Sequence, residues 1–539
     1  MRISYFKHGA AAAGAVLAAV VLAAWPAGPF YSEDTPRYGG VLRVREDGVA
    51  PHPNLDPAVH SWTFATEQLF EGLVRLNAKL DIVPALAEYW IISEDGRKTT
   101  FILKRGVKFH NDREMNSLDV KFSLERLLRR DTQSPYAQLF ISKVAGAQEF
   151  WDGKADEVAG FRAPEKFVFE IQWKNPYVSA LYLLSMSFCK ILPRELLLDQ
   201  GRNFFWQPVG TGPFKFDSWI RSPRLDVVGV RLERFSRYHD RRSYLDAIEF
   251  SPHFSVDQFM DDEVQVMPFL SERMATSRSQ IVQGGLYNMT FLMMSCQNPP
   301  LDSAAVRLAV AAAIDKDRLA QAYGGSAGAL RSSANFIPPG LPGFFPIDDR
   351  LSGDPEKARR LLADFGYLVE RTFPKLLFFI PLPRSDAAIR MGRELESQLE
   401  KVGIPISVRF VPSVSALRDV KQPFLAFVPW RMDFPDAENI IQPLFTSGSE
   451  FNRAVCRYDS PEFDKLFEEA EVEKSWTRRA DLFRRMERLL ASDAPALPLF
   501  FAEERFAVQG RVRGLKIPAL GFSYLDTRFV WMEKKEPGH

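Results

Sequence analysis

Cysteine is scarce in this sequence of 539 residues, which contains three. Cys189, Cys296 and Cys456 are each separated from the next by more than a hundred residues. An odd and widely spaced set excludes a disulfide framework and the closely spaced cysteines of a zinc knuckle. One disulfide bond remains open, and the spacing does not choose between the possible pairs.

An excess of charge of one sign is also missing. The chain has 69 Lys and Arg against 68 Asp and Glu, a formal net charge of +1. Because nucleic acids are bound by clustered Lys and Arg, this balance argues against nucleic acid as the main partner. With 46% hydrophobic residues the composition is globular. At roughly 150 residues per domain, the length favours several domains.

Signatures of metal and nucleotide chemistry are absent as well. The seven histidines form no HxxxH pair and lie near no cysteine, which argues against a zinc site. There is no Walker A motif and no G-x-G-x-x-G, so we expect no metal and no cofactor. His52 and His60 flank a proline-rich turn and could meet a metal chelate or haem, although two polar loop residues are the simpler account.

One short motif suggests nucleophilic catalysis, but its context is wrong. Residues 324–328 match G-x-S-x-G. That motif needs a strand before its Ser and a helix after it. Here a helix is expected to end at Tyr323 and a loop follows. We therefore expect no catalytic residue and no enzyme activity.

Long apolar runs are confined to the N-terminus. Basic residues precede an apolar run at 9–25, a pattern typical of an export signal. The run is about 17 residues long and a spanning helix needs about 20, so residues 1–36 are expected to be either a cleaved signal peptide or a membrane anchor. In both cases the body of the protein is expected outside the cytoplasm.

The rest of the chain alternates between strand-like and helix-like patterns. Strands are expected at 40–45, 99–103, 167–173, 225–232, 406–411 and 497–501. Helices are expected at 303–323, 354–366, 385–402, 461–473 and 477–492. At 354–366 the start and stop signals of the helix are explicit, because Asp354 can cap the helix, Pro355 suits its first position and Gly366 can end it. The fold class is therefore α/β.

A series of short segments, in order along the chain, matches one known family. The segments are Gly39–Val44 (GGVLRV), Asn54–Pro57 (NLDP), Gln68–Arg75 (QLFEGLVR), Val83–Trp90 (VPALAEYW), Ser93–Gly96, Gly106–His110 (GVKFH), Gly210–Phe214 (GTGPF), Tyr244–Asp246 (YLD), Ala313–Asp315, Pro338–Gly340, and Trp430 with Asp433, Pro435 and Asp436. From Gly39 onward the chain resembles the solute-binding proteins of dipeptide and oligopeptide ABC transporters, the family 5 extracellular solute-binding proteins. Each match is weak alone, but the ordered series is specific.

The resemblance implies a two-lobed periplasmic binding protein fold with mixed sheets, a hinge of two crossing strands and an extra subdomain in the first lobe. Combined with the expected elements, it predicts a first lobe of residues 37–288 plus 497–539, with the subdomain at about 60–170. Residues 289–496 are predicted to form the second lobe.

The resemblance also implies a function. A periplasmic protein of this family captures a peptide-like solute between its lobes, without catalysis, and delivers it to an ABC permease in the inner membrane. Ligand contacts that form only in the closed state shift the equilibrium between open and closed lobes.

Peptides share a backbone and termini, so a general binder is expected to use main-chain pairing and one fixed charge at the amine. In the family this charge is the Asp of a W-x-x-D segment, which corresponds to Asp433. Trp430 is the expected aromatic wall beside it, and Arg431 and Asn54 are further candidate ligand contacts. Asp433 could instead be a turn acid before Pro435.

Departures from the family pattern keep other functions open. Residues 260–270 (MDDEVQVMPFL) replace a common G-E-x-D turn, and Ser295 and Ser303 stand where Asn and Asp are common. Family members also bind metal chelates, haem and other solutes, so a non-peptide ligand is one alternative. A membrane-anchored structural or interaction subunit that reuses the scaffold is another, because the signal lacks a lipoprotein cysteine and a good cleavage site.

Overall fold

The computed structural model describes residues 35–46, 54–59, 63–285, 287–324, 330–347, 352–367 and 371–534. The chain divides into the compact units Met1–Pro36 and Arg37–His539. Nearly all of the expected signal or anchor lies outside the described residues. Among the helices that are described, none has the length and apolar character needed to cross a membrane.

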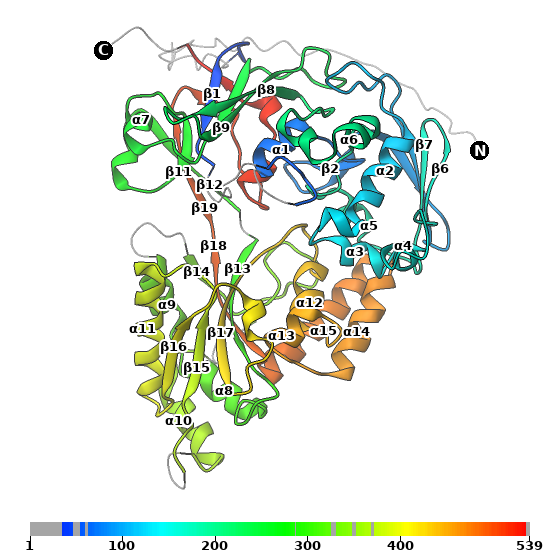
Figure 1. Ribbon diagram of the computed structural model, residues 1–539. Coiled ribbons are helices and arrows are strands. Elements are labelled where there is room, and N and C mark those ends of the chain that lie inside the picture. The colour runs from blue at the N-terminus through cyan, green and yellow to red at the C-terminus, as the bar shows by residue number, and fades with distance from the viewer. Residues whose placement is uncertain are drawn as a thin grey trace, which may run out of the picture. The chain divides into compact units, whose positions relative to one another are not determined.

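The unit Arg37–His539 contains two lobes, each built on a mixed sheet (Figure 1). The first sheet has seven strands in the order β12-β19-β11-β1-β10-β9-β8. Its strands are β1 (Val41–Val44), β8 (Phe214–Arg221), β9 (Val227–Arg234), β10 (Ala247–Phe250), β11 (Val266–Pro268), β12 (Ser279–Gly284) and β19 (Glu504–Gln509). The central strand β1 runs parallel to β10 and β11, and the other pairs are antiparallel. Helix α1 (Thr63–Leu69) packs Phe64 against Phe250 and Phe522 in this core.

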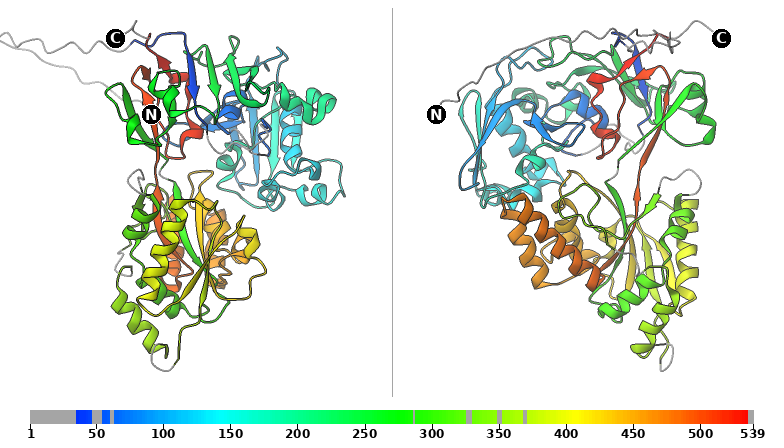
Figure 2. Two further views of the ribbon diagram at one scale, coloured as in Figure 1. Left: turned by 60° about the vertical axis from the view of Figure 1, so that its left-hand side comes forward. Right: turned by 180° about the vertical axis from the view of Figure 1, so that it is seen from behind.

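A subdomain lies beside this sheet (Figure 2). Its antiparallel strands have the order β4-β5-β7-β6. They are β4 (Ala87–Ile92), β5 (Lys98–Leu103), β6 (Phe161–Glu165) and β7 (Val168–Gln172), with the hairpin β2 (Val74–Leu76) and β3 (Ile82–Pro84) nearby. Its helices are α2 (Ser117–Leu127), α3 (Ala137–Ile141), α4 (Ala147–Trp151) and α5 (Ala180–Leu184), and α6 (Arg194–Gln200) follows. Phe101 and Phe169 are buried cross-strand partners, as expected for half-buried antiparallel strands.

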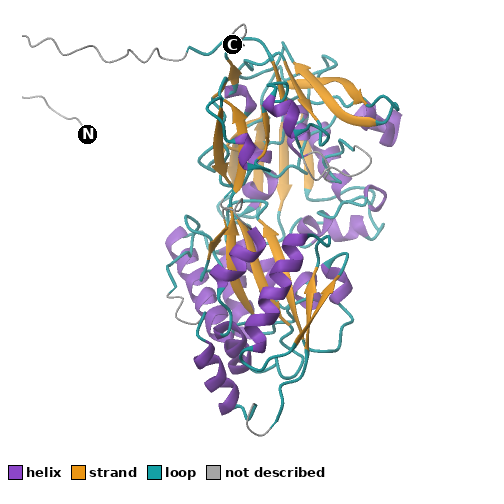
Figure 3. Ribbon diagram, turned by 90° about the vertical axis from the view of Figure 1, so that its left-hand side faces the viewer, coloured by secondary structure: helices purple, strands orange, loops and turns teal. Residues whose placement is uncertain are grey.

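The second lobe has a six-stranded sheet in the order β14-β18-β13-β17-β15-β16. Its strands are β13 (Asn288–Met294), β14 (Leu330–Ser332), β15 (Leu376–Ile380), β16 (Ile406–Phe410), β17 (Phe424–Arg431) and β18 (Ala496–Ala502). Its helices are α8 (Ala304–Ala312), α9 (Lys316–Gly324), α10 (Pro355–Asp364), α11 (Asp386–Glu400), α12 (Glu438–Phe445), α13 (Glu450–Ala454), α14 (Pro461–Val472) and α15 (Trp476–Asp493) (Figure 3).

Strand β13 is apolar without interruption from Phe291 to Met294 because both faces of this sheet are covered. Met289, Phe291 and Met293 pack into the core that contains α12 to α15. Leu292 and Met294 point to the opposite face and pack into the core that contains α8 to α11. A strand buried on both faces loses the alternation of apolar and polar residues, as this one does.

Two chain segments connect the lobes. Strand β12 of the first sheet leads to β13 of the second, and β18 of the second sheet leads to β19 of the first. Strand β18 pairs with β13 and β14. The exact boundaries of the lobes stay a prediction. Because β18 belongs to the second sheet, this pairing favours a second crossing between the lobes near residue 503 instead of residue 497.

The single helix expected at 303–323 is wrong. The chain forms α8 and α9 with a break at 313–315. Gln398 of α11 accepts a hydrogen bond from the Asp315 main-chain N–H at 2.8 Å, and the Asp315 carboxylate accepts one from the Arg318 N–H at 3.1 Å. A tertiary contact therefore replaces the helical hydrogen bond of Asp315, and its side chain restarts the helix.

Other local expectations hold more closely. Asp354 caps α10 by accepting from the Lys357 N–H, and Pro355 is its first residue. The strand expected from residue 225 begins at Val227, because Leu225 has a left-handed φ of 66° and its N–H closes a turn onto the Ser222 carbonyl.

Candidate functional site

Three of the four predicted ligand contacts lie together at the end of β17. Trp430 and Arg431 are the last residues of this strand and pair with Met289 and Asn288, the first residues of β13. Asp433 follows two residues later, in the short segment before α12. The group therefore lies where the chain crosses between the lobes.

Asp433 contacts residues that are distant in sequence. Its main-chain N–H donates to Asn439 Oδ1 at 2.8 Å, and its carbonyl accepts a hydrogen bond from the Tyr524 hydroxyl at 2.9 Å. Tyr524 lies in the C-terminal segment 504–534 that returns to the first sheet. Burial and the negative charge of Asp433 both raise the pKa of Tyr136 of the subdomain. The half-buried Asp433 thus meets groups from both lobes.

The carboxyl group of Asp433 is electrostatically undercompensated. Burial raises its pKa above the ordinary value, and a hydrogen bond with Asn439 and the charge of Arg431 oppose this shift only in part. Among the described residues, no cation lies within ion-pair distance of it. A partly desolvated carboxylate gains most from a cationic partner.

The ring of Trp430 is held in place by contacts within the second lobe. Its indole N–H donates to the Asn439 carbonyl at 3.0 Å, and its ring meets Phe451 of α13 edge to face, with ring centroids 5.5 Å apart. Asn439 therefore fixes both the Trp430 ring and the Asp433 main chain. The remaining surface of the half-buried indole is available for packing.

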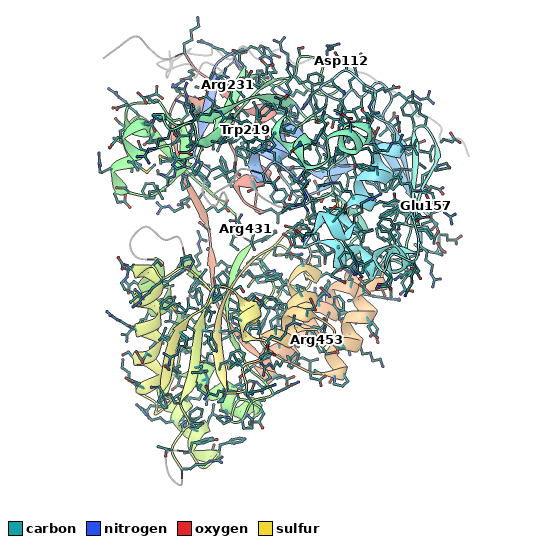
Figure 4. All side chains as sticks on the ribbon, in the orientation of Figure 1. Asp112, Glu157, Trp219, Arg231, Arg431 and Arg453 are labelled. Carbon is teal, nitrogen blue, oxygen red and sulfur yellow. The ribbon has the colours of Figure 1, made fainter. Side chains whose placement is uncertain are left out.

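Arg431 is largely exposed between the lobes (Figure 4). Its guanidinium pairs with Glu504 at 3.0 Å, and its Nε donates to Asn288 Oδ1 at 3.2 Å. Glu504 begins β19 of the first sheet, whereas Arg431 ends β17 of the second. The Arg431–Glu504 ion pair therefore connects the second sheet to the first.

The side chain of Asn54 stabilises the turn in which Asn54 itself lies. Its side-chain oxygen accepts a hydrogen bond from the Asp56 N–H at 2.8 Å. Asp56 in turn forms a buried, bidentate ion pair with Arg126 of α2. These contacts explain the NLDP segment as a turn that anchors α2 and leave a role of Asn54 in ligand binding untested.

A cavity of about 90 Å³ opens within the first lobe. Its lining comes from two segments and three single positions between them: Glu67, Gln68, Phe70, Glu71, Gly72, Arg75, Leu76 and Ala85; Lys190, Pro213 and Tyr238; and Ser523, Tyr524, Leu525, Asp526 and Arg528. Tyr524, which donates to Asp433, is part of this lining. The cavity and the main chain of Asp433 are therefore joined through one side chain.

Charges of both signs face this cavity. Lys190 pairs with Glu67 at 2.7 Å, and the second carboxylate oxygen of Glu67 is buried with no hydrogen-bond partner. Glu71 accepts from the Tyr238 hydroxyl at 2.7 Å and contacts His239 Nε2 at 2.8 Å. Burial raises the pKa of Glu67 above its ordinary value, whereas His239 and the neighbouring donors hold the pKa of Glu71 below it despite burial.

An acidic and basic cluster closes the other side of the cavity. Arg528 makes a bidentate contact with Asp526 at 2.8 and 2.6 Å and pairs with Asp240 at 2.6 Å. Arg75 approaches the same two carboxylates at 3.7 and 3.8 Å. The sequence reasoning did not assign these residues, although Glu71 and Arg75 belong to the QLFEGLVR segment, which was the available signal.

A buried polar network joins the subdomain to the second lobe. Arg479 of α15 pairs with Asp436 and donates to Ser179 at 3.0 Å. Tyr177 donates to Glu438 at 3.2 Å, and Lys143 pairs with Glu438 at 3.5 Å. Asp436 and Glu438 belong to the chain just after Asp433. The same segment therefore carries the candidate anchor and the contact between lobes.

The remaining chemical signatures give no second site within the described residues. No group of three or more His, Cys, Asp or Glu side chains is placed there to hold a metal. His52, His60 and Ser326 of the G-x-S-x-G match lie outside the described residues. His110 is structural, because its ring accepts from the Gly210 N–H and contacts the Gly212 carbonyl at 3.0 Å, and burial lowers its pKa to about 4.

Known proteins have similar sequences over most of their length. The dipeptide-binding protein of Escherichia coli K12 is 27% identical over 88% of this chain and 91% of its own length. The heme-binding protein A of Haemophilus influenzae is 26% identical over 86% of this chain and 87% of its own length.

Solved structures show the same two-lobed fold. The periplasmic binding protein DppA of Helicobacter pylori, in complex with the peptide STSA, has a TM-score of 0.74, with 24% identity over 92% of this chain and 99% of that one. HbpA2 of Haemophilus parasuis has a TM-score of 0.77, with 22% identity over 92% of this chain and 100% of that one.

The family-level comparison covers the subdomain, most of the second lobe and the Trp430–Asp433 segment. The profile of the bacterial extracellular solute-binding proteins, family 5, matches residues 81–452, more than half of the chain. With the two mixed sheets and their two crossings, this match assigns the fold as that of a two-lobed periplasmic binding protein. The chain belongs to the family 5 extracellular solute-binding proteins of bacteria.

Proposed function

We propose that this protein captures a peptide-like solute between its two lobes and delivers it to the permease of an ABC transporter, without catalysing a reaction. The Escherichia coli relative is named a dipeptide-binding protein, and the Helicobacter pylori structure holds a peptide. These names support a peptide ligand, and the chemistry at Asp433 makes the proposal specific.

The observation that carries the proposal is the undercompensated carboxylate of Asp433. It is half-buried, and burial raises its pKa. The main-chain carbonyl of Asp433 accepts from Tyr524 of the first lobe, and burial together with the charge of Asp433 raises the pKa of Tyr136 of the subdomain. The α-ammonium group of a peptide is the cation that every unmodified peptide provides. Its binding would replace the missing counter-charge only when both lobes surround the site.

The other predicted contacts have roles consistent with this anchor. Trp430 would pack against the first peptide unit, since its ring is held in place by Asn439 and Phe451. Arg431 would act at the crossing, where ligand binding competes with its Glu504 pair. Asn54 would position the first lobe through its turn. The cavity with Lys190 and Glu67 would receive a polar part of the ligand.

The test compares Asp433→Asn with the unchanged protein against a short peptide with a free amine and its N-acetylated form. Hydrogen bonds to charged groups contribute about 1.5–3 kcal/mol, so affinity for the free peptide should fall roughly ten- to a hundredfold. Titration calorimetry measures both affinities.

The acetylated peptide is the matched control. It lacks the cation, so unchanged protein should bind it weakly, and Asp433→Asn should cause little further loss. The double comparison isolates the contact between Asp433 and the amine. Equal losses for both peptides would make Asp433 a turn residue, and absence of any peptide binding by the unchanged protein would contradict the proposed function.

We propose a periplasmic location for the mature protein, with residues 1–36 acting as a signal peptide or as an inner-membrane anchor. The family description places its members outside the cell, and the N-terminal run has the composition of an export signal. N-terminal sequencing of the exported protein decides between a start at residues 24–37 and retention of the leader. A start at Met1 in the cytoplasm would contradict export.

Haem is the second candidate ligand. The heme-binding protein of Haemophilus influenzae is nearly as similar to this chain as the dipeptide-binding protein. Titration with haemin, followed by its visible absorption, tests this reading. Saturable haemin binding that competes with peptide would favour a haem-related ligand, whereas haemin binding without competition would place it outside the site at Asp433.

A further inference from the structure

Two of the three cysteines lie side by side in the second lobe. The Sγ atoms of Cys296 and Cys456 are 3.8 Å apart, although the residues are 160 positions apart in sequence. Cys296 follows β13 and Cys456 follows α13. Cys189, in contrast, lies in the core of the subdomain and hydrogen-bonds to the Leu183 carbonyl at 3.3 Å.

The main chains of the two cysteines are also locked together. The Cys296 N–H donates to the Cys456 carbonyl at 2.8 Å. One residue further along, Arg457 Nη1 donates to Asn298 Oδ1 at 3.0 Å. These contacts hold the two main chains side by side, with the sulfur atoms 3.8 Å apart, so a disulfide with an S–S length of about 2.05 Å needs only a short approach of the two thiols.

We propose that Cys296 and Cys456 form a disulfide bond once the protein leaves the cytoplasm. This inference rests on the extracytoplasmic location in the proposed function, because disulfides persist in oxidising compartments. The thiols need only a rotation about their Cα–Cβ bonds, since the backbone is already placed. Each gives up a weak hydrogen bond at 3.3 Å, Cys296 to Met294 and Cys456 to Pro495.

The reaction has a defined direction of attack. Cys296 is partly exposed, whereas Cys456 is buried. The hydrogen bond with Cys456 and the charge of Arg307 lower the pKa of Cys296, which favours the thiolate there. The Cys296 thiolate attacks the disulfide of an oxidising protein or of oxidised glutathione and displaces its first thiolate. Cys456 then attacks Cys296 Sγ and displaces the second, so that two electrons reach the oxidant and both thiol protons are released.

The bond would brace the wall behind the candidate site. Cys456 lies two residues after α13, and this helix carries Phe451, which meets the ring of Trp430. Cys296 lies two residues after β13, the strand that pairs with Trp430 through Met289. The disulfide would therefore fasten the far end of α13 to the sheet that positions Trp430.

The experiment counts and maps thiols in the full exported protein. The protein is blocked with iodoacetamide under denaturing conditions, before and after reduction, and non-reducing peptide maps are read by mass spectrometry. We expect one alkylated cysteine before reduction, Cys189, and three after it. The purified, reduced protein with oxidised glutathione should regain the linked 296–456 peptide.

Variants make the assignment specific. Cys296→Ser and Cys456→Ser should each leave two alkylated cysteines before reduction, whereas Cys189→Ala should keep the linked peptide. Reduction should lower the midpoint of thermal unfolding by several degrees in the unchanged protein and not in Cys296→Ser, because the bond closes a long loop in the unfolded chain.

Three alkylated cysteines in both the exported and the glutathione-treated protein would overturn the inference, as would a link that involves Cys189. The outcome is separable from that of the proposed function. Peptide affinity is measured on the same exported protein before any reduction, so absence of the disulfide with intact peptide binding refutes only the bond. A disulfide without peptide binding refutes only the proposed ligand.

Discussion

Arg479 donates hydrogen bonds to both carboxylate oxygens of Asp436, and both side chains are only 1% exposed. The second guanidinium nitrogen, 2.9 Å from Asp436 Oδ1, also donates to Ser179 of the subdomain. Asp436 lies three residues after Asp433. The ion pair therefore holds the segment of the candidate site and docks it on the other lobe with one side chain.

Arg479→Met should destabilise the protein strongly. It leaves the buried Asp436 without its cation, a change that typically costs about 3–5 kcal/mol. Urea unfolding measures the loss, and Arg478→Met, an exposed neighbour on the same helix, should stay within about 0.5 kcal/mol of the unchanged protein. Equal effects of the two substitutions would show that the pair does not hold the lobes.

Peptide affinity should depend on pH through Asp433. Burial raises its pKa in the free protein above the ordinary value, so the carboxyl takes up a proton as the pH falls through that raised pKa. An ammonium group binds the ionised form, and affinity should therefore fall as the pH is lowered. Calorimetry from about pH 7 to about pH 4 should show this decline for the free peptide. A decline of equal size for the acetylated peptide would assign it to another group.

Glu487 should make the protein less stable as the pH rises. Its Oε1 accepts from Asn335, Phe336 and Ile337, its Oε2 is buried without a partner, and burial raises its pKa from 4.5 to about 7. The native state therefore keeps a proton that the unfolded state loses. Stability from this group is complete below pH 4.5 and is lost as the pH rises to about 7, a difference of about 3 kcal/mol.

Glu487→Gln tests this directly. The amide keeps the acceptor and cannot ionise, so unfolding free energy should vary less between those two pH values and should exceed that of the unchanged protein at neutral pH. Asp481→Asn, on the same helix with a largely exposed side chain, is the control and should leave the pH profile unchanged. A profile that Glu487→Gln does not flatten would show that the carboxyl ionises freely.

Gly210 should tolerate no side chain. A Cβ there would stand 1.9 Å from the Leu69 carbonyl oxygen, and the Gly210 N–H already donates to His110. Gly210→Ala must move the main chain beside the cavity, with an expected cost of about 1–3 kcal/mol or more. Gly448→Ala, where no atom lies within 4 Å, should change stability little. Similar unfolding midpoints for the two variants would contradict the close approach.

The sequence by itself determined the features that depend on local chemistry and on ordered motifs. The cap at Asp354 and the proline at Pro355 placed the start of α10, because a side-chain acceptor and a fixed φ act within one turn. The family series then supplied the two-lobed fold that these short patterns could not specify.

Tertiary structure alone decided what depends on residues far apart. Gln398 interrupts the expected helix at Asp315. Lys190 and Arg528 reach the same cavity from distant segments, Tyr524 meets Asp433 across the lobes, and Cys296 finds Cys456 instead of Cys189. Each of these contacts depends on a long chain closure whose geometry is set by the packing of whole sheets and helices. A local sequence pattern does not contain that geometry. The sequence could therefore identify Asp433 as a candidate, but it could not predict which distant residues contact Asp433.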